Sequence, residues 1–444
     1  MFERLRGTRD FLPNEMAARK KVFSSIKKSV EEFGFFETDT PAIELFELYS
    51  IKSGEEIIEE LYAFEDKGGR MISLRPELTP SVVRVLVSRA KELSFPVKWY
   101  SIPRLWRYER PQSGRLREFY QLNIDIFGSE DSRADTEVIS CAIKLLCDLG
   151  FDESDIEVRI SDRRMLQEIL LNLGIKNYHD VLKIIDKREK ITERDFKEML
   201  SGISLDSNQI KEIEVFLNSK GDFLKSIEKI SKSYKGEELS KVIESLKKIA
   251  QNLNDRGYEK FITFDPSIVR GLDYYTGMVF EVHDKKREFR ALFGGGRYDN
   301  LAELFGGEHI PAVGFGMGDA VLELMMRRKN IWPEEKVEID LFIATIGDVE
   351  KEVSKVLTSL RNNEFKVDFD IMGRNLSNQM KFANKLGAKS LLIIGERDLK
   401  EGNVTLRDLK SGEENKVSLN EFISSPSKYL TALLNNSSQM KRKA

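Results

Sequence analysis

The chain has 444 residues, 41% of them hydrophobic. This length exceeds what one hydrophobic core usually serves, so we expect several domains. Charged residues make up 33%, but 71 lysines and arginines nearly balance 74 aspartates and glutamates, so the formal net charge of −3 neither supports nor excludes a nucleic-acid partner. No apolar run approaches the roughly 20 residues that cross a bilayer, and the N-terminus lacks the apolar stretch of a signal peptide, so we expect a cytoplasmic protein without membrane contact.

The N-terminal part of the chain is predicted to mix helices and strands. A helix is expected from Asn14, a candidate N-cap, to Gly34, a glycine suited to ending it. A strand over residues 35–40 should follow and end at Pro41. Further predicted elements are a strand over residues 71–74, a helix that begins at Pro80 with Thr79 as its cap, and two or three long strands between residues 97 and 127.

The middle of the chain changes character. Residues 164–255 form a series of amphipathic patterns rich in lysine and glutamate with few strand signals, which predicts a helical insertion. Strand patterns return after it, so we expect the first fold to resume there. The predicted elements on the two sides are strands at residues 156–160, 261–264 and 278–282, a turn at residues 294–296 and an apolar helix from about Asp319.

The C-terminal part begins after a predicted linker at residues 333–336. Strand patterns at residues 339–345, 366–371 and 390–394 alternate with helix patterns at residues 350–361 and 376–386. This alternation predicts a small α/β domain. The expected domains are therefore residues 1–333, interrupted by the insertion, residues 337–432, and a polar flexible tail at residues 435–444.

The most informative stretch is the pair of strands between Arg104 and Gly128. Side chains alternate on a strand, so every second residue of its second arm shares a face. That face carries Arg117, Phe119, Gln121, Asn123 and Asp125. A cation, a ring, an amide and a carboxylate in a row suit the floor of a cleft, although a hairpin with one solvated charged side fits the periodicity about equally well.

The preceding arm places Arg107 and Glu109 on a common face in the same way. Arg107 would hold a phosphate oxygen through charge-assisted hydrogen bonds, and Phe119 would stack on a purine. Fixed cations of this kind, together with Mg²⁺, stabilise the charge that develops in phosphoryl or adenylyl transfer. The stretch therefore indicates a site for an anionic ligand with a flat ring.

Several motifs resemble those of the histidyl-tRNA synthetases, a class II aminoacyl-tRNA synthetase family. Residues 107–121 are similar to the second class II motif as this family carries it. In the catalytic part, residues 6–13 resemble the family's N-terminal motif, residues 74–79 its amino-acid-binding loop, and residues 270–277 its histidine-specific signature, with residues 294–299 following at the expected place. In the C-terminal part, residues 379–387 and 394–396 resemble the anticodon-binding domain. The resemblance implies an α+β fold: an antiparallel class II sheet with flanking helices, a helical insertion and a C-terminal α/β domain.

The resemblance also implies an activity. Such a ligase activates histidine with ATP, accompanied by Mg²⁺, to give histidyl-adenylate and pyrophosphate, and then transfers histidine to the end of tRNA(His). It implies a homodimer as well, because residues 14–41 correspond to the class II interface, and one surface pairing with itself is physically plausible. The alternative for these residues is a helix and strand that face the core of a monomer.

Three residues would hold the α-ammonium of histidine by resemblance: Glu77, Thr79 and Gln121. A cation needs acceptors around it, which agrees with these residue types. The alternatives are a surface carboxylate for Glu77 and a helix cap for Thr79.

The imidazole would be recognised by Asp125 and Tyr275, with Tyr298 lining the pocket. An acceptor on one side and a hydroxyl on the other distinguish a ring with two nitrogens from its isosteres. Many relatives carry glutamate where Asp125 stands. The alternative for both tyrosines is core packing with a satisfied hydroxyl.

Arg270 is the residue we expect to act in catalysis together with Arg107, by resemblance, on the substrate carboxylate and the α-phosphate; its alternative is a salt bridge with Asp273. The other expected ATP contacts are Glu109, Arg115, Arg117, Phe119, Gly316 and Gly318. The third class II motif normally ends in an arginine that grips the γ-phosphate, and Val321 stands at that position. We expect Arg115 to substitute for it.

Transfer RNA would meet Gln112 at its acceptor end, and Arg374 and Lys381 on a basic face of the C-terminal domain, which could also be a solvated helix side. No structural metal is expected, because two cysteines and three histidines lie in no familiar ligand spacing. Two rival functions stay open: a non-catalytic paralogue that acts as a regulatory subunit, and a module that binds uncharged tRNA. Histidine-dependent pyrophosphate exchange separates the enzyme from both.

Overall fold

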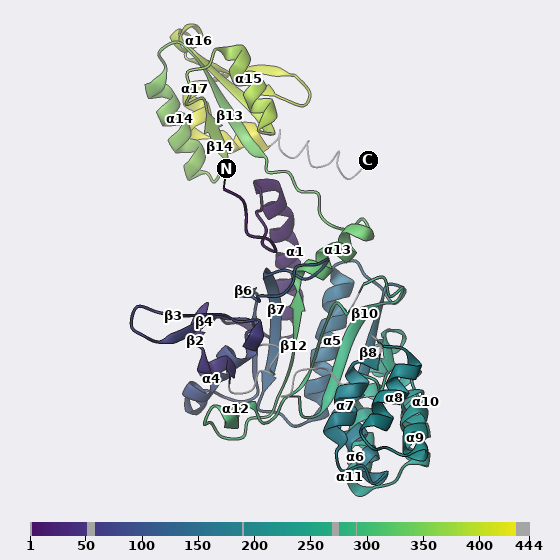
Figure 1. Cartoon of the computed structure of the whole chain (residues 1–444). Coiled ribbons are helices and arrows are strands. Elements are labelled where there is room, and N and C mark those ends of the chain that lie inside the picture. Colours follow the sequence, from purple (N-terminus) through teal and green to yellow (C-terminus); the bar gives the residue numbers. More distant parts are fainter. Residues whose placement is uncertain (1, 51–57, 189–190, 269–274, 290, 432–444) are drawn as a thin grey trace. The chain divides into compact units, whose positions relative to one another are not determined.

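A computed structural model of the chain describes residues 2–50, 58–188, 191–268, 275–289 and 291–431 (Figure 1). The chain divides into two compact units, one built from residues 1–10 and 21–332 and the other from residues 11–20 and 333–444. The expected flexible tail at residues 435–444 lies outside the described residues. Within the described ranges, no helix has the length and apolarity that crossing a membrane would require.

The first unit is built on a nine-stranded sheet with the order β1-β5-β7-β12-β11-β10-β8-β9, and β6 pairs with β7. The pairs from β5 to β8 along this order are antiparallel, whereas β1–β5 and β8–β9 are parallel. The strands are β1 (Phe36–Glu37), β5 (Val97–Ser101), β6 (Arg104–Trp106), β7 (Glu118–Phe127), β8 (Ile156–Asp162), β9 (Ile262–Phe264), β10 (Met278–Asp284), β11 (Phe293–Arg297) and β12 (Ala312–Gly318).

The two faces of this sheet belong to different hydrophobic clusters. Leu122, Ile124 and Ile126 of β7 are buried in one cluster with the apolar sides of two helices, α5 (Ser132–Asp148) and α13 (Asp319–Arg328). The opposite face packs against α4 (Thr79–Arg89) and the short α12 (Leu301–Leu304). The odd-numbered residues of β7 from Phe119 to Asp125 therefore lie on the face opposite the larger core, as the alternation predicts.

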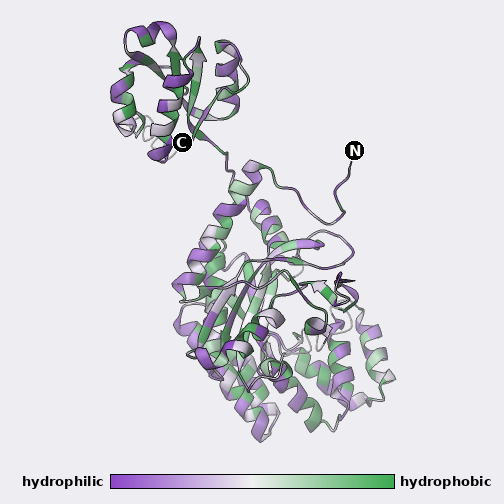
Figure 2. Cartoon of the chain, turned by 90° about the vertical axis from the view of Figure 1, so that its left-hand side faces the viewer, coloured by the Kyte–Doolittle hydropathy of each residue, from purple (hydrophilic) through white to green (hydrophobic). Residues whose placement is uncertain are grey.

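Among the described residues, six helices follow β8 in the region where an insertion is predicted. They are α6 (Arg163–Asn172), α7 (Tyr178–Asp186), α8 (Glu193–Gly202), α9 (Ser207–Leu217), α10 (Phe223–Ser233) and α11 (Glu237–Asp255). Four of them begin at a side-chain cap, from Asp162, Thr192, Asp206 and Asp222. Figure 2 shows hydrophobic and hydrophilic residues side by side on these helices, which is the amphipathic pattern that the sequence predicts.

A small antiparallel sheet stands beside the central one, with the order β2-β4-β3. Its strands are β2 (Ile43–Leu45), β3 (Tyr62–Glu65) and β4 (Met71–Leu74), and the short α2 (Glu47–Ser50) follows β2. The first unit also contains α1 (Pro13–Glu32), whose first residues belong to the second unit, and the 3-10 turns η1 (Ala90–Glu92) and η3 (Glu259–Phe261).

The second unit is the predicted α/β arrangement. Its five-stranded sheet has the order β14-β13-β15-β16-β17, in which the first three strands are parallel and the last two are antiparallel. The strands are β13 (Ile339–Ile346), β14 (Val367–Phe369), β15 (Ala388–Gly395), β16 (Asn403–Asp408) and β17 (Glu414–Ser418); the helices are α14 (Glu350–Asn362), α15 (Leu376–Lys385), α16 (Glu396–Lys400) and α17 (Leu419–Ser424). The predicted α+β class is confirmed.

Three local predictions are wrong. Residues 294–296 form the middle of β11 rather than a turn, because a Cβ on Gly295 would lie 2.0 Å from the carbonyl oxygen of Gly314 and only glycine allows the two strands to approach. Thr79 does not cap α4: the helix begins at Thr79, and its N-cap, Leu78, makes no side-chain bond. Asn14 lies inside α1, and its Oδ1 accepts the Val337 N–H at 2.8 Å.

Candidate active site

The polar face of β7, from Phe119 to Asp125, lies beside a row of glycines on β12. We call this strip of the sheet face the furrow. In the register of the two strands, Gly314 faces Asp125, Gly316 faces Asn123 and Gly318 faces Gln121. A Cβ on Gly314 would lie 2.3 Å from the Asp125 carboxylate, and a Cβ on Gly316 would lie 2.9 Å from Gln121 Nε2. The missing side chains of β12 therefore leave the room that the polar side chains of β7 occupy.

The glycines at 314, 316 and 318 all belong to strand β12, and the helix of the third motif begins only at Asp319. The position of Gly318 is more open than the other two, since a Cβ there would have only Phe119 Cδ2 nearby, at 4.0 Å. The face of the sheet is thus less crowded at Gly318, next to Phe119, than at the other two glycines.

The cationic end of the furrow gathers Arg107, Glu109, Arg115 and Phe119. The Arg107 guanidinium lies 5.7 Å from the centre of the Phe119 ring. Glu109 is the common anion, 3.8 Å from Arg107 and 3.3 Å from Arg115. Arg107 Nε also donates to the Pro76 carbonyl at 2.9 Å, which ties this end to the segment that carries Glu77.

Arg117 is held by other contacts. Its guanidinium lies 4.2 Å from the centre of the Tyr108 ring, and its Nε donates to the Glu109 carbonyl at 3.1 Å. Gln112 forms an isolated bridge with Arg115 at the exposed tip between the two arms. The strand before this tip, β6, ends at Trp106, so Arg107 and Glu109 lie beyond the strand on which we expected them to share a face.

Asp125 lies at the other end of the furrow and is 4% exposed. Burial raises its pKa to about 7, and the hydrogen bond that the Tyr298 hydroxyl donates to it acts in the opposite direction. Tyr298 is itself buried and packs edge-on against Phe127 with ring centres 6.5 Å apart. A buried acceptor and a phenol thus share one hydrogen bond inside the furrow.

Tyr275 is buried on the same face of the sheet, in the cluster that contains Tyr298. A Cβ on Gly296 would lie 2.9 Å from its Cδ1, so the ring lies directly over that glycine. Arg270, the expected catalytic arginine, and Asp273, its alternative partner, lie outside the described residues.

Glu77 is a buried carboxylate, 5% exposed, so its reading as a surface residue is wrong. Thr79 stands at the first position of α4 and is partly exposed. The N-cap of α4 is Leu78, so the alternative role of Thr79 as a helix cap is also wrong. Both residues follow Pro76, whose carbonyl accepts from Arg107.

The beginning of α13 carries contacts that the sequence did not reveal. Arg9 donates to both Asp319 oxygens at 3.0 and 2.8 Å, and the Tyr120 N–H donates to the same carboxylate at 3.1 Å. Asp319 thus joins the opening segment to β7. Val321 is buried in the larger core. No local pattern marks a pair 310 residues apart.

In the second unit, Arg374 donates to Asp370 at 2.7 Å, and its guanidinium lies 4.3 Å from the centre of the Phe382 ring. Lys381 is exposed on α15. Gln379, buried beside them, exchanges hydrogen bonds with the backbone of Thr345 at 2.7 and 3.0 Å. Arg374 and Lys381 therefore lie on either side, in sequence, of a buried residue that is hydrogen-bonded to β13.

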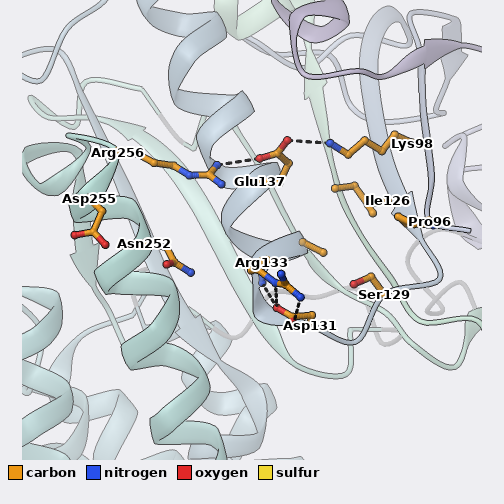
Figure 3. A pocket seen from close by; sticks show the side chains of 11 residues that line it. Pro96, Lys98, Ile126, Ser129, Asp131, Arg133, Glu137, Asn252, Asp255 and Arg256 are labelled. Carbon is orange, nitrogen blue, oxygen red and sulfur yellow. Dashed lines mark hydrogen bonds and ion pairs between the residues drawn. The ribbon is translucent and has the colours of Figure 1, made fainter.

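A cavity of about 500 Å³ lies elsewhere in the first unit, between β5, β7, α5 and α11 (Figure 3). None of the predicted site residues lines it. Lys98 and Arg256 both bind Glu137 at 2.9 Å, and Arg133 binds Asp131 at 2.9 Å. Each of these three cations is therefore paired with a carboxylate. Among the described residues, no cluster of histidine, cysteine and carboxylate side chains is suited to a metal ion.

Comparison with known proteins identifies the two units. The family model described as histidyl-tRNA synthetase matches residues 7–319, and the model described as anticodon binding domain matches residues 340–426. The chain is 41% identical to a histidine–tRNA ligase of Natronomonas pharaonis and 42% identical to one of Thermoplasma volcanium, in each case over 95% of this chain and 97% of the relative.

A solved structure agrees in fold. The histidyl-tRNA synthetase of a Nostoc species is 24% identical, with a TM-score of 0.78 over 97% of this chain and 99% of that chain. The family model alone covers well over half of the sequence, and the curated relatives match it almost end to end. The chain belongs to the histidyl-tRNA synthetase family.

Proposed function

We propose that this protein ligates histidine to tRNA(His) in two steps and that the furrow between β7 and β12 holds the reacting groups of the first. Histidine and ATP give histidyl-adenylate and pyrophosphate, and the tRNA then takes the histidine and releases AMP. Membership of the family and about 40% identity to histidine–tRNA ligases support the activity. One observation carries the assignment of the site: a buried acceptor at Asp125 and a cationic end at Arg107 lie on one face of the sheet.

Histidine would lie at the buried end of the furrow. Its imidazole would donate to Asp125, next to Tyr298 and Tyr275, and its α-ammonium would bind Glu77, Thr79 and Gln121. Such a pocket disfavours an apolar isostere, because the buried carboxylate would lose the imidazole N–H as a donor. The burial of Asp125, Tyr275 and Tyr298 supports this reading.

ATP would lie at the cationic end. Adenine would stack on Phe119 beside Glu109, with Gly316 and Gly318 allowing the backbone close to the ring, and Arg107 would bind the α-phosphate. Arg115 and Arg117 would meet the outer phosphates, although both already contact Glu109. Mg²⁺ enters with ATP as part of the substrate and neutralises phosphate charge.

The first step is an attack of the histidine carboxylate oxygen on the α-phosphorus. The new bond joins that oxygen to phosphorus, and the bond to the bridging oxygen breaks as pyrophosphate leaves with its electron pair. Arg107 stabilises the charge on the α-phosphoryl oxygens, and Arg270 would bridge carboxylate and phosphate. No side chain has to act as a nucleophile, because the substrate supplies it.

The second step would begin when the terminal ribose hydroxyl of the tRNA attacks the carbonyl of the adenylate. An ester forms, AMP leaves with the electron pair of the broken bond, and the phosphate accepts the hydroxyl proton. Gln112 would meet the acceptor end, and Arg374 and Lys381 the anticodon region. We further propose that the protein works in the cytoplasm as a homodimer paired through residues 14–41.

Histidine-dependent exchange of pyrophosphate into ATP tests the proposal. The purified protein should catalyse exchange with histidine and not with other amino acids, and Arg107→Ala should abolish it. A protein that binds tRNA(His) without any exchange would instead be a binding module. A protein silent in both assays would fit the regulatory paralogue. The buried Val321 in place of the third-motif arginine leaves the binding module as the second candidate.

A further inference from the structure

Arg297, the last residue of β11, joins segments that are far apart in the sequence. It is 4% exposed. Nε and Nη2 donate to the two carboxylate oxygens of Asp135 at 3.0 and 2.7 Å, and Nη1 donates to Asp299 at 3.1 Å. The remaining N–H groups donate to the carbonyls of Ser129 at 2.8 Å and Asp131 at 3.5 Å. All five donors of the guanidinium are used.

The same residue reaches the segment of Tyr275 through its backbone. The Thr276 N–H donates to the Arg297 carbonyl at 2.7 Å. The Thr276 hydroxyl donates to Asp299 Oδ2 at 3.1 Å and lies 3.0 Å from the Asp299 N–H. Thr276 follows Tyr275 and Asp299 follows Tyr298, so one hydrogen-bond network fixes the residues next to both tyrosines.

Two glycines make this arrangement possible. A Cβ on Gly277 would lie 3.2 Å from Arg297 Cδ, and a Cβ on Gly296 would lie 2.9 Å from Tyr275 Cδ1. The stem of Arg297 and the ring of Tyr275 therefore lie against bare backbone. Since both contacts involve β11 or the residue just before β10, the strands set where the Tyr275 ring stands.

The arginine does not touch the furrow itself. Its bidentate partner Asp135 belongs to α5, and both groups are buried. A buried ion pair contributes little net stability compared with apolar packing, because both charges lose their hydration, yet removing one partner leaves the other uncompensated. A pair of this kind is better explained by the geometry it imposes than by the stability it adds.

We infer that Arg297 is a positioning residue that sets the spacing of Tyr275 and Tyr298 and thereby the fit of the amino-acid pocket for histidine. The inference rests on the proposed function, because it takes the space beside these tyrosines as the imidazole pocket. It assigns no chemical step to Arg297. Its effect should therefore fall on histidine recognition and not on ATP.

Arg297→Lys tests the inference, with pyrophosphate exchange by the full-length protein as the measurement. Lysine keeps the charge but cannot bind Asp135 in bidentate fashion. We expect the KM for histidine to rise by about tenfold or more and the KM for ATP to stay within about twofold, since small displacements of a binding group cost affinity steeply. Arg159→Lys is the matched control: Arg159 is equally buried in the same sheet, with Glu157 and Asp265 as partners.

A second pair of variants keeps the test sharp if the arginine variant does not fold. Thr276→Val removes the hydroxyl that binds Asp299 and should raise the KM for histidine. Thr276→Ser keeps a hydroxyl, so its KM for histidine should stay near that of the unaltered protein. Equal rises of both KM values in Arg297→Lys and Arg159→Lys would overturn the inference and leave a purely structural ion pair. Absence of exchange in the unaltered protein would instead contradict the proposed function.

Discussion

Asp125 is the residue whose chemistry is most altered by its surroundings. Burial raises its pKa to about 7, so near neutral pH the free side chain is divided between acid and carboxylate. The carboxylate is the stronger acceptor for the N–H of a neutral imidazole, because a charged acceptor strengthens the hydrogen bond. Recognition of histidine should therefore strengthen as the pH rises through this pKa.

The first prediction is a pH dependence. The KM for histidine in pyrophosphate exchange should fall between about pH 6 and about pH 8, and Asp125→Asn should remove most of this fall, leaving only the titration of free histidine near about pH 6.5. The ATP KM serves as internal control. An unchanged pH profile in the variant would show that Asp125 does not face the imidazole.

The same pKa predicts a stability change of definite sign. Because the folded protein holds the Asp125 proton more tightly than the unfolded chain does, this group's contribution is present at low pH and is lost as the pH rises from about 4 to about 7. In thermal unfolding, the unaltered protein should show this loss of stability, whereas Asp125→Asn should not. A variant whose melting temperature follows the same pH curve would contradict the raised pKa.

Arg115 is the residue that we expect to replace the missing arginine of the third motif. It is partly exposed and lies 3.3 Å from Glu109, so it would have to leave this ion pair to bind a phosphate. Arg115→Ala should raise the KM for ATP about tenfold, the low end of what a charge-assisted hydrogen bond contributes, because water screens the site. Arg194→Ala, an exposed ion-paired arginine in α8, should leave it unchanged. Equal ATP affinity in both variants would exclude Arg115.

For individual residues, the sequence predicted those placements that follow from the alternation of side chains along a strand. Phe119, Gln121 and Asp125 share the furrow face because they are spaced by two on one strand. The partners of Arg9 and Arg297 could not be predicted, since they lie 310 and 162 residues away and only the fold brings them near. Motif resemblance marked residues 294–299 without indicating that Arg297 is buried.

Among the elements, the glycine-bearing strands β11 and β12 were the hardest to foresee. Glycine is rare within strands, so residues 294–296 read as a turn. In the sheet, the same residues let β12 and the Tyr275 ring approach, and tertiary contact overrides local preference. The helices with one apolar face, such as α13 and α14, begin at the residues that the pattern predicts, Asp319 and Glu350.

Gly316 tests the role of β12 directly. A Cβ at this position would lie 2.9 Å from Gln121 Nε2 and 3.1 Å from Asn123 Oδ1, so Gly316→Ala should push Gln121 out of place. We expect the KM for histidine to rise at least about fivefold, and more than the KM for ATP. Gly202→Ala, with open space around its position in α8, is the control. An unchanged KM for histidine in Gly316→Ala would argue against Gln121 as a histidine ligand.

For the whole molecule, the edge of the central sheet is the feature that bears on the proposed dimer. Phe36 of β1 is 73% exposed, within the residues that we propose as the dimer interface. A large exposed ring on an edge strand is a feature of surfaces that pair. Sedimentation at micromolar concentration should show a dimer, and Phe36→Glu should shift it toward monomer. Ile371→Glu, equally exposed in the second unit, should not. A monomer in every case would refute the proposed pairing.

We propose that one furrow holds both histidine and the nucleotide. A crystal structure with a non-hydrolysable histidyl-adenylate analogue can check this. We expect the imidazole against Asp125 and Tyr298, the adenine on Phe119, and the guanidinium groups of Arg107 and Arg270 both at the phosphate position of the analogue. An analogue bound away from β7, or Arg107 and Arg270 in separate regions with no shared cavity, would contradict it.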